Sequence, residues 1–510
     1  MSRSRVAVLG AGVGGLIAAI ELAHAGFETV LLERQPRVGG KLREVSAGGR
    51  SVDSGPTVLT MRWVFDELFD AVGDDFARRV TLHPASVLAR HAWDETGHLD
   101  LYADPQETSD AIGRFAGSAE AAGYVSLCRR AGQLFGALDR SFLRKPRPRG
   151  PLGLMLAAGI GGTLAMSRTS PFKTLWDVLC EHFRDPRLRQ LFGRYATYCG
   201  ASPFAAPATL LLISHVEQLG VWFVEGGMQR LADALEQLAV RCGVEVRCNE
   251  TVARVDVAQG AVSGIRCASG EDIAVDAVVC NADTAALSLG LLGREARTAV
   301  AAGSSHARSL SAITWSCMAR CEDFPIRHHN VFFSDDYAHE FDALMGADLP
   351  DDPTVYVCAQ DRETTLEPAP GEAERLFILI NAPAVGDSRA FSEEDIQRCR
   401  TRTLARLRQA GLKLTMSETE CSATTPRDFA TRFPGTGGAL YGPALHGWRA
   451  AFQRPGSRTA IRGLYLAGGS VHPGPGLPMA ALSGRLAAAT LIADSASSAR
   501  FRTTVMHGGT

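Results

Sequence analysis

Residues 6–41 read VAVLGAGVGGLIAAIELAHAGFETVLLERQPRVGGK, and this stretch decides the fold. A run of four apolar residues enters a glycine-rich turn at 10–15, and a stretch with helical periodicity follows as far as Ala25. A second apolar run at 29–32 then ends at Glu33. Strand, glycine turn, helix and strand in this order predict a βαβ unit that binds a nucleotide.

The glycines of this turn have distinct expected roles. Gly10 permits the tight turn, Gly12 lets the backbone approach a pyrophosphate, and Gly15 lets the helix pack closely on the strand. The helix that starts here presents unpaired N–H groups and the positive end of its dipole to the phosphates. Glu33 lies eighteen residues beyond Gly15, where a carboxylate can accept hydrogen bonds from a ribose hydroxyl.

The motif continues beyond Glu33 as RQPRVGG at 34–40, followed by Lys41. This second glycine pair brings more backbone close to the same ligand, and Lys41 places a cation beside its phosphates. An NAD enzyme has no need of a second glycine turn. The extension resembles the flavoprotein family that includes amine oxidases, protoporphyrinogen oxidases, carotenoid desaturases and the prenyl-binding GDP-dissociation inhibitors. This resemblance implies FAD as the cofactor.

Composition narrows the class of protein. A chain of 510 residues with 46% apolar content can bury a large core, and we expect two intertwined domains. The net charge of −2 gives no electrostatic footprint for nucleic acid. The twelve cysteines form no CxxC pair and lie in apolar segments, and the histidines are dispersed except for His328-His329 in an expected loop. No metal site is predicted.

A second motif lies near the C-terminus, where residues 463–479 read GLYLAGGSVHPGPGLPM. The pattern predicts a buried strand, a turn rich in glycine and proline, and a helix that continues through Leu491. Such a strand delivers backbone beside the cofactor, and the new helix aims its positive end at an electron-rich atom of the ligand. Reduced flavin carries negative charge near its pyrimidine edge, so this helix end would stabilise it.

The C-terminal motif resembles that of carotenoid desaturases of the bacterial phytoene-desaturase type, in which a strand and a Gly-rich turn lead through His-Pro-Gly to a helix headed by proline. The resemblance extends to 53–57, 225–228 and 281–283 and so covers essentially the whole chain. Amine oxidases more often have an acidic residue where Ser470 stands. Together the motifs and the resemblance imply FAD contacts at Gly10, Gly12, Gly14, Gly15, Glu33, Arg34, Gly40, Lys41, Gly55, Pro56, Thr57, Val252, Asn281, Gly468, Gly469, Pro478 and Met479.

Two further stretches indicate a branch of this family. TMRWVFDELFDAVG at 60–73 and HVEQLGVWFVEGGM at 215–228 are most similar to enzymes that introduce a C-3,4 double bond into acyclic 1-hydroxy or 1-methoxy carotenoids in purple phototrophic bacteria. The resemblance implies a substrate such as 1-hydroxyneurosporene. A phytoene desaturase is the close alternative. A non-catalytic prenyl-lipid carrier of the GDP-dissociation-inhibitor type is the alternative from another class, and such a carrier would hold no flavin.

Desaturation beside a polyene needs a hydride acceptor, and oxidised flavin provides one at N5. Positive charge that develops in the substrate spreads over the conjugated chain, so only a weak base is needed for the remaining proton. His472 and Asp53 are the polar residues that the motifs place nearest the flavin, and for each the alternative is a hydrogen bond that stabilises a turn. Oxygen or a quinone would reoxidise the flavin, and no motif in the sequence indicates which of them is the electron acceptor.

Exposing a C40 hydrocarbon to water costs about 0.8 kcal/mol of free energy for each CH₂ group. The substrate must therefore pass from a bilayer directly into an apolar tunnel. We interpret an uncharged stretch at 150–167 as the mouth of this tunnel on an anionic membrane surface, because a basic run precedes it. A buried helix after a solvated basic loop is the alternative. Residues 192–212, with Tyr195, Tyr198 and Phe204, are the expected wall. The basic run consists of Arg140, Arg144, Lys145, Arg147 and Arg149.

No secretory signal opens the chain, since the first apolar run enters the glycine turn directly. We expect a cytoplasmic protein that is peripheral on the inner or intracytoplasmic membrane. The expected fold is α/β, with a Rossmann-like FAD-binding domain, an interleaved α+β substrate-binding domain and a helical membrane-facing part. The expected divisions are FAD-binding parts at 1–100, 221–290 and 426–494, a helical insertion at 101–220, a substrate-binding sheet domain at 291–425 and a disordered tail at 495–510.

Overall fold

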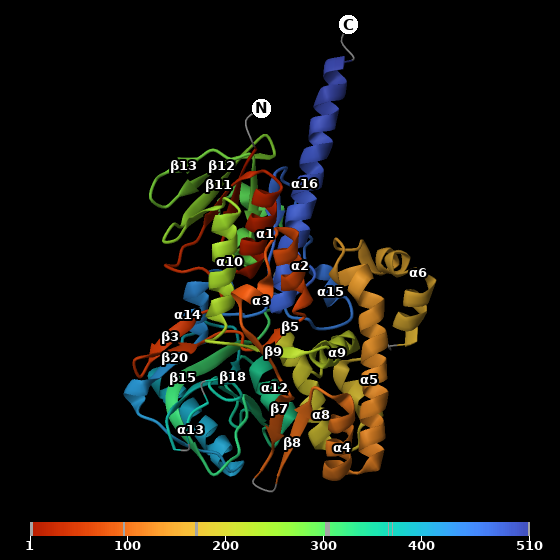
Figure 1. The fold of residues 1–510 in the computed structure, drawn as a ribbon, viewed down its shortest axis with the longest axis vertical. Coiled ribbons are helices and arrows are strands. Elements are labelled where there is room, and N and C mark those ends of the chain that lie inside the picture. The colour runs from red at the N-terminus through yellow and green to blue at the C-terminus, as the bar shows by residue number, and fades with distance from the viewer. Residues whose placement is uncertain are drawn as a thin grey trace.

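The computed structural model describes residues 4–94, 97–168, 172–300, 307–365, 367–369 and 371–507. Its two larger sheets have five and eight strands. In Figure 1 the five-stranded sheet and its helices lie in the upper half, and the eight-stranded sheet lies at the lower left. A group of helices from α4 to α9 stands beside them on the right (Figure 1).

The five-stranded sheet is parallel and has the order β10-β2-β1-β14-β21. Its central strand, β1 (Arg5–Leu9), pairs with β2 on one side and β14 on the other. The sheet is therefore assembled from the beginning, the middle and the end of the chain, as the N-terminal and C-terminal motifs predict. The remaining strands are β2 (Glu28–Leu32), β10 (Glu245–Arg247), β14 (Ala277–Cys280) and β21 (Leu464–Leu466).

The two faces of this sheet are covered differently, because alternate residues of a strand point to opposite sides. Val6 and Val8 belong to the hydrophobic core that contains the helices on one face. Ala7 and Leu9 pack against a small antiparallel sheet on the other. The helices are α1 (Val13–His24), α10 (Gln229–Arg241) and α16 (Leu477–His507), and the small sheet consists of β11 (Val252–Ala258), β12 (Ala261–Cys267) and β13 (Asp272–Ile273), with the short α11 (Thr284–Ser288) beyond it in the sequence.

The eight-stranded sheet has the order β19-β15-β18-β17-β16-β7-β8, with β20 paired to β15. Apolar residues of α13 (Glu393–Gln409) pack on it. Strands were expected between 291 and 425, and most of the sheet does come from there. Its members are β7 (Val87–Ala92), β8 (His98–Tyr102), β15 (Ser311–Glu322), β16 (His329–Phe332), β17 (Val355–Ala359), β18 (Glu374–Ala382), β19 (Lys413–Thr415) and β20 (Cys421–Thr424).

The strands β7 and β8 depart from the sequence interpretation, which divides the chain at 100 between a FAD-binding part and a helical insertion. β7 pairs in parallel with β16, so residues 87–102 belong largely to the second sheet. All six residues of β7 are buried, and Arg90 and His91 interrupt the apolar run that would indicate a buried strand. Arg90 is buried against Asp100 of β8, with Arg90 Nη2 2.7 Å from Asp100 Oδ2.

Short strands connect the two units. The hairpin expected between 42 and 60 is present as β3 (Glu44–Ala47) and β4 (Arg50–Asp53). A three-stranded sheet of order β5-β9-β6 lies near the centre of the molecule in Figure 1. Its strands and the adjoining helices are β5 (Leu59–Thr60), α2 (Trp63–Ala71), α3 (Phe76–Arg79), β6 (Leu82–Pro84) and β9 (Val221–Val224).

The insertion from 105 to 218 is helical, as expected, and within the described residues no helix is both long and apolar enough to cross a bilayer. The uncharged stretch at 150–167 forms α6, which breaks at Gly159, where φ is 67° and ψ is −175°. The helices are α4 (Pro105–Ala116), α5 (Ser118–Leu138), a π-helical turn at Asp139–Leu143, α6 (Gly150–Arg168), α7 (Leu175–His182), α8 (Pro186–Gly193), 3₁₀ turns at Arg194–Cys199 and Ala208–Leu211, and α9 (Leu212–Gln218).

The C-terminal helix differs from the expectation of a disordered tail at 495–510. α16 continues to His507 and extends away from the body of the molecule (Figure 1). Helix-forming alanines at 493, 496 and 499 favour this continuation. The remaining helices are α12 (Tyr337–Met345), α14 (Pro426–Arg432) and α15 (Ala450–Gln453).

Candidate active site

The glycine turn between β1 and α1 has the tight geometry that the sequence predicts. Gly10 has a φ of 95°, and its N–H donates to the carbonyl of Leu32 at 2.8 Å. A Cβ on Gly15 would lie 2.0 Å from the carbonyl oxygen of Gly10. Side chains are therefore excluded at these positions, and the start of α1 stays open to a ligand.

Glu33 lies at the end of β2 with its carboxylate held against this turn. The side chain is 6% exposed, and its oxygens accept from the N–H groups of Ala11 at 2.7 Å and Gln35 at 2.9 Å. A carboxylate offers about four lone-pair directions, so it keeps capacity for ribose hydroxyls. The N–H groups of Asn249 and Glu250 donate to the carbonyls of Gln35 and Glu33 and so bring the start of β11, Val252, beside this end of β2.

The second glycine turn contacts the first. The N–H of Gly39 donates to the carbonyl of Ala11 at 2.8 Å, and a Cβ on Gly40 would lie 3.1 Å from the Cα of Gly12. Arg34 is exposed. Lys41 is turned toward the interior, where its ammonium donates to the carbonyl of Leu440.

The environment of Lys41 identifies it as a residue of the cavity described below. Its Nζ lies 5.2 Å from the centroid of the Phe433 ring. Burial lowers the pKa of Lys41, while Asp283 opposes the change and Arg454 adds to it. A Cβ on Gly55 would lie 1.9 Å from the carbonyl oxygen of Lys41, so glycine is required where segment 53–57 passes this residue.

The C-terminal motif closes over the same turn. The Asn281 amide donates to the carbonyl of Gly10 at 3.1 Å, and a Cβ on Gly468 would lie 2.8 Å from Asn281 Oδ1. A Cβ on Gly14 would lie 2.9 Å from the carbonyl oxygen of Ala480, in the first turn of α16. Glycines on both motifs therefore let two helix N-termini approach one another.

These residues fit FAD. A side-chain-free cradle, two helix N-termini and a buried carboxylate beside the glycine turn match the pyrophosphate and ribose of a dinucleotide. Leu477, Pro478 and Met479, at the start of α16, line an adjoining cavity, where that helix end would face a flavin ring.

This cavity has a volume of about 430 Å³ and lies where the two units and the helical group meet. One wall contains the predicted cofactor contacts Gly55, Pro56 and Thr57. Most of the lining is apolar, as a hydrocarbon substrate requires. It comes from helices, through Leu138, Phe142, Leu143, Leu154 and Ile213, and from the eight-stranded sheet, through Val331, Phe377 and Leu379.

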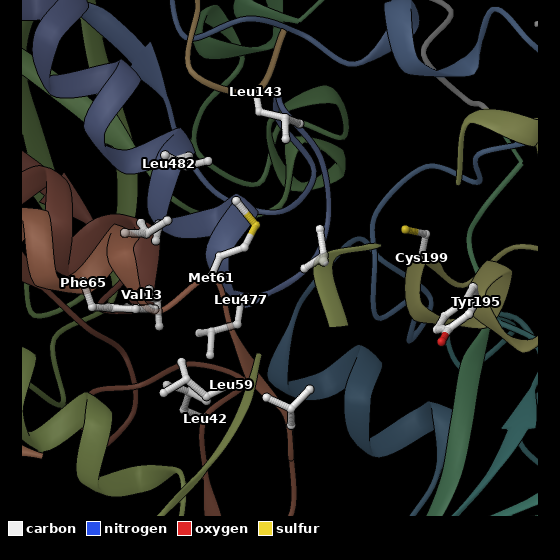
Figure 2. Packing of buried hydrophobic residues seen from close by; sticks show 14 of the residues in the cluster. Val13, Leu42, Leu59, Met61, Phe65, Leu143, Tyr195, Cys199, Leu477 and Leu482 are labelled. Atoms are coloured by element: carbon white, nitrogen blue, oxygen red, sulfur yellow. The ribbon is translucent and has the colours of Figure 1, made fainter. Parts of the chain in front are cut away.

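Figure 2 shows that the hydrophobic core around this cavity is built from several elements of the fold. One buried cluster contains Val13 of α1, Leu59 of β5, Met61 directly after that strand, Leu477 and Leu482 of α16, and side chains of the helical insertion. Of the expected wall at 192–212, Tyr198 and Cys199 line the cavity, whereas Tyr195 and Phe204 are absent from its described lining. Those two rings instead pack on other aromatic rings, namely Phe192 for Tyr195 and Trp176 for Phe204.

Asp53, one of the two candidate catalytic residues, lies beside the turn that precedes α10. Its Oδ2 accepts from the N–H of Met228 at 2.6 Å, and Oδ1 has no hydrogen-bond partner among the described residues. Burial raises the pKa of Asp53 to about 6. Its neighbour Ser54 lines the cavity, and Asp53 is not in the described lining.

His472, the other candidate, is tied to the helical insertion. Its Nε2 lies 3.0 Å from the carbonyl oxygen of Phe142 and 2.9 Å from that of Lys145, which is consistent with an Nε2–H donor. Burial lowers the pKa of His472. The following residues, Pro473 to Met479, line the cavity, while His472 itself is only 1% exposed and stands behind them.

The sequence interpretation missed a buried polar cluster in the cavity wall. Arg194, at the end of α8, donates to the Tyr198 hydroxyl at 2.5 Å. The hydroxyls of Tyr195 and Tyr198 each donate to Glu217 of α9 at 2.7 Å. The sequence does contain one feature that could have indicated this cluster. Arg194 is the only Asp, Glu, Lys or Arg residue between Arg189 and Glu217.

A second polar group lines the cavity on the side of the sheet. The Tyr356 hydroxyl lies 2.7 Å from both Thr57 Oγ1 and His329 Nδ1. His329 is in β16 rather than in a loop, and atoms of His328, His329 and Cys358 lie within 4.8 Å of one another. Since these three side chains are buried and His328 Nδ1 is 2.9 Å from the carbonyl oxygen of Arg362, we assign them no ligand.

Curated relatives resemble this chain over nearly its full length. The chain is 49% identical over 511 aligned positions to the hydroxyneurosporene desaturase of Rubrivivax gelatinosus, with 99% of this chain and 96% of that protein covered. It is 44% identical to the protein of the same name from Cereibacter sphaeroides, with 97% and 99% covered. It is 30% identical to the 4,4'-diapolycopene oxygenase of a Methylomonas species, with 96% and 98% covered.

Solved structures share the fold at low sequence identity. A putrescine oxidase variant with redesigned cofactor binding has a TM-score of 0.60 at 13% identity, covering 96% of this chain and 99% of that one. A fatty acid isomerase from P. acnes has a TM-score of 0.56 at 15% identity, covering 94% and 97%. The model of the family described as flavin containing amine oxidoreductase matches residues 13–492. The chain therefore belongs to the flavin containing amine oxidoreductase family and, within it, to the carotenoid desaturase type.

Proposed function

We propose that this protein is a FAD-dependent desaturase that introduces a C-3,4 double bond into an acyclic 1-hydroxy or 1-methoxy carotenoid such as 1-hydroxyneurosporene. One observation carries the proposal: the glycine cradle opens into an apolar cavity, walled on one side by Gly55, Pro56 and the start of α16. The near full-length similarity to two hydroxyneurosporene desaturases supports the choice of substrate.

When bound, the flavin supplies the hydride acceptor for this reaction. The protein's own contribution is to bind, orient and dehydrate the substrate. Apolar side chains from the helices and the sheet hold the polyene along the cavity and exclude water. The start of α16 at Leu477 presents its positive end to the cavity.

Asp53 and His472 serve in this proposal as supports for the site. Asp53 holds the turn before α10 through Met228, and His472 joins the turn before α16 to the carbonyls of Phe142 and Lys145. Neither side chain is in the described lining of the cavity. They position the two backbone turns against which FAD would bind.

We further propose that the protein takes its substrate from a membrane surface through a mouth at α6. Leu154 lines the cavity, while Leu152 and Leu156 on the same helix are 75% and 85% exposed. Trp448, also in the cavity wall, packs edge to face on Phe172, which is 75% exposed. Apolar surface therefore continues from the cavity to the outside.

An anaerobic experiment tests the function. FAD-loaded protein is mixed separately with 1-hydroxyneurosporene and with phytoene, and the flavin absorption and the product spectrum are followed together. We expect 1-hydroxyneurosporene to bleach the flavin and to gain one double bond at C-3,4.

Two other outcomes are informative. Bleaching by phytoene alone would replace the proposal with a phytoene desaturase. A correctly folded protein that stays colourless with excess FAD would instead indicate a carrier of prenyl lipids.

A further inference from the structure

Arg194 is a buried cation with unused hydrogen-bond donors. The residue is 6% exposed and lines the cavity. Nη1 donates to Tyr198, but Nε and Nη2 have no partner among the described residues. Buried guanidinium N–H groups without acceptors are costly, so this arrangement indicates a site for an acceptor that enters the cavity.

The residues around Arg194 keep it charged and leave those donors free. Tyr195 and Tyr198 each occupy one oxygen of Glu217, so the carboxylate is held by two phenols. Burial favours a lower pKa for Arg194, but Tyr198, Glu217 and Tyr195 together raise the pKa above its usual value. The cluster is thus a preformed cationic donor in an apolar wall.

The cluster connects to the side of the cavity where the flavin would bind. Tyr198 and Tyr356 both line the cavity, where burial raises the pKa of Tyr356 and Tyr198 adds to the increase. The Tyr356 hydroxyl in turn contacts Thr57, next to Pro56 and Gly55. The predicted cofactor contact Thr57 and the donor Arg194 therefore line the same cavity, each with a tyrosine hydroxyl beside it.

This position matches the chemistry of an oxygenated carotenoid end. The oxygen on C-1 is separated from C-3 by only one further carbon, so a donor that fixes the oxygen also fixes the C-3,4 bond. A guanidinium only donates hydrogen bonds, and both a hydroxyl and an ether oxygen accept them. One residue can therefore hold either type of end group.

We propose that Arg194, held by Tyr198 and Glu217, binds the C-1 oxygen of the substrate and so selects oxygenated ends over hydrocarbon ends. This inference rests on the proposed function. Arg194 is a specificity residue in this scheme: the apolar wall binds the polyene, and the guanidinium sets which carbons lie beside the flavin.

The test compares two substrates that differ in one oxygen. The FAD-loaded wild type and Arg194→Met are assayed with 1-hydroxyneurosporene and with 1,2-dihydroneurosporene, which has the same saturated end without the hydroxyl. We expect kcat/KM for the hydroxylated substrate to fall roughly 10- to 100-fold in the variant, as for the loss of a hydrogen bond from a charged donor. The value for the hydrocarbon should change less than threefold, so the ratio of the two collapses.

Three further variants separate binding from structure. Arg194→Lys keeps a cationic donor and should restore part of the ratio, and Tyr198→Phe, which releases the guanidinium, should lower it by a smaller factor. If Arg194→Met takes up no FAD, the ratio in these two variants decides. Arg187→Met, in the preceding helix α8 and paired with Asp185 at the surface, is the matched control and should keep the wild-type ratio.

The possible failures are distinct. An unchanged ratio in Arg194→Met, or in both Arg194→Lys and Tyr198→Phe, would overturn the role of Arg194 and leave the desaturase function standing. A wild type that desaturates neither substrate would overturn the function itself.

Discussion

At the scale of single residues, Asp53 shows how a buried carboxyl can serve a turn at a cost in stability. The carboxyl accepts a short hydrogen bond from Met228, yet burial raises its pKa to about 6, with a further increase from Glu44 that Arg375 partly offsets. An unfolded aspartate titrates near pH 4. The folded protein therefore binds more protons than the unfolded chain between about pH 4 and pH 6.

The sign of the resulting pH dependence follows from this difference. As pH rises from 4 to 6, ionisation of Asp53 should lower the free energy of unfolding, by about 3 kcal/mol for a shift of about two pKa units. Asp53→Asn removes this loss while its amide oxygen can still accept from Met228. Urea unfolding from pH 4 to pH 7 should show that the free energy of unfolding of the variant increases relative to that of the wild type as pH rises.

The exposed Asp110 is the control for this measurement. Asp110→Asn makes the same change of side chain at the surface and is measured over the same pH range. A pH-independent difference between Asp53→Asn and the wild type would show that the Asp53 carboxyl does not titrate in this range.

The placement of residues that depends on local spacing was predictable, and the placement that depends on distant packing was not. Gly10, Gly15 and Glu33 follow from one continuous motif. Arg194 and Glu217 are separated by a 3₁₀ turn and another helix, so only the folded chain brings them to the same cavity wall. For His472, the sequence indicated a polar group near the flavin but not its partners, Phe142 and Lys145, which lie about 330 residues earlier.

At the scale of elements, the crossing of α1 and α16 joins the two ends of the nucleotide-binding unit. A Cβ on Gly484 would lie 2.2 Å from the carbonyl oxygen of Gly14. Gly484→Ala should therefore force the helices apart, lower the free energy of unfolding by about 1–3 kcal/mol and reduce FAD content. Denaturant unfolding and the flavin-to-protein absorbance ratio measure the two effects.

A second helical glycine provides the matched control. A Cβ on Gly136, in α5, meets no atom within 4 Å. Gly136→Ala should leave FAD content unchanged and raise stability by up to about 1 kcal/mol, because alanine is the better helix former. Equal effects of the two substitutions would contradict the close contact between α1 and α16.

The basic run before α6 contains two kinds of residue. Arg144 lies 3.5 Å from the Trp63 ring centroid and pairs with Glu67 and Asp139, and Arg147 donates to the carbonyl of Phe452. Lys145 and Arg149 are exposed. The structure therefore separates the cations that hold the fold from those available to a membrane.

This separation defines a membrane test. Lys145→Gln combined with Arg149→Gln should weaken binding to vesicles with anionic lipid about 10- to 30-fold at low salt, since each cation near such a surface contributes about 1 kcal/mol. FAD content should not change. Arg230→Gln combined with Arg408→Gln, on α10 and α13 away from α6 (Figure 1), is the control. Vesicle binding that is equal in both double variants would remove α6 as the membrane contact.

At the scale of the whole molecule, the sequence predicted the interleaved α/β plan because each glycine motif belongs to the same parallel sheet. The sequence did not predict that β7 and β8, within the first 102 residues, belong to the second sheet. A strand that is buried along its whole length shows no alternation of polar and apolar residues, and its partner β16 lies more than 200 residues later.

The order of strands in the five-stranded sheet has a consequence for biosynthesis. β21, at Leu464–Leu466, is the last strand to be translated, and α16 follows it. A growing polypeptide on the ribosome therefore lacks one edge of the cofactor cradle until residues 464–466 have been made. FAD can consequently find its complete site only after this strand has paired, and the apolar cavity walls that were made earlier stay uncovered until then.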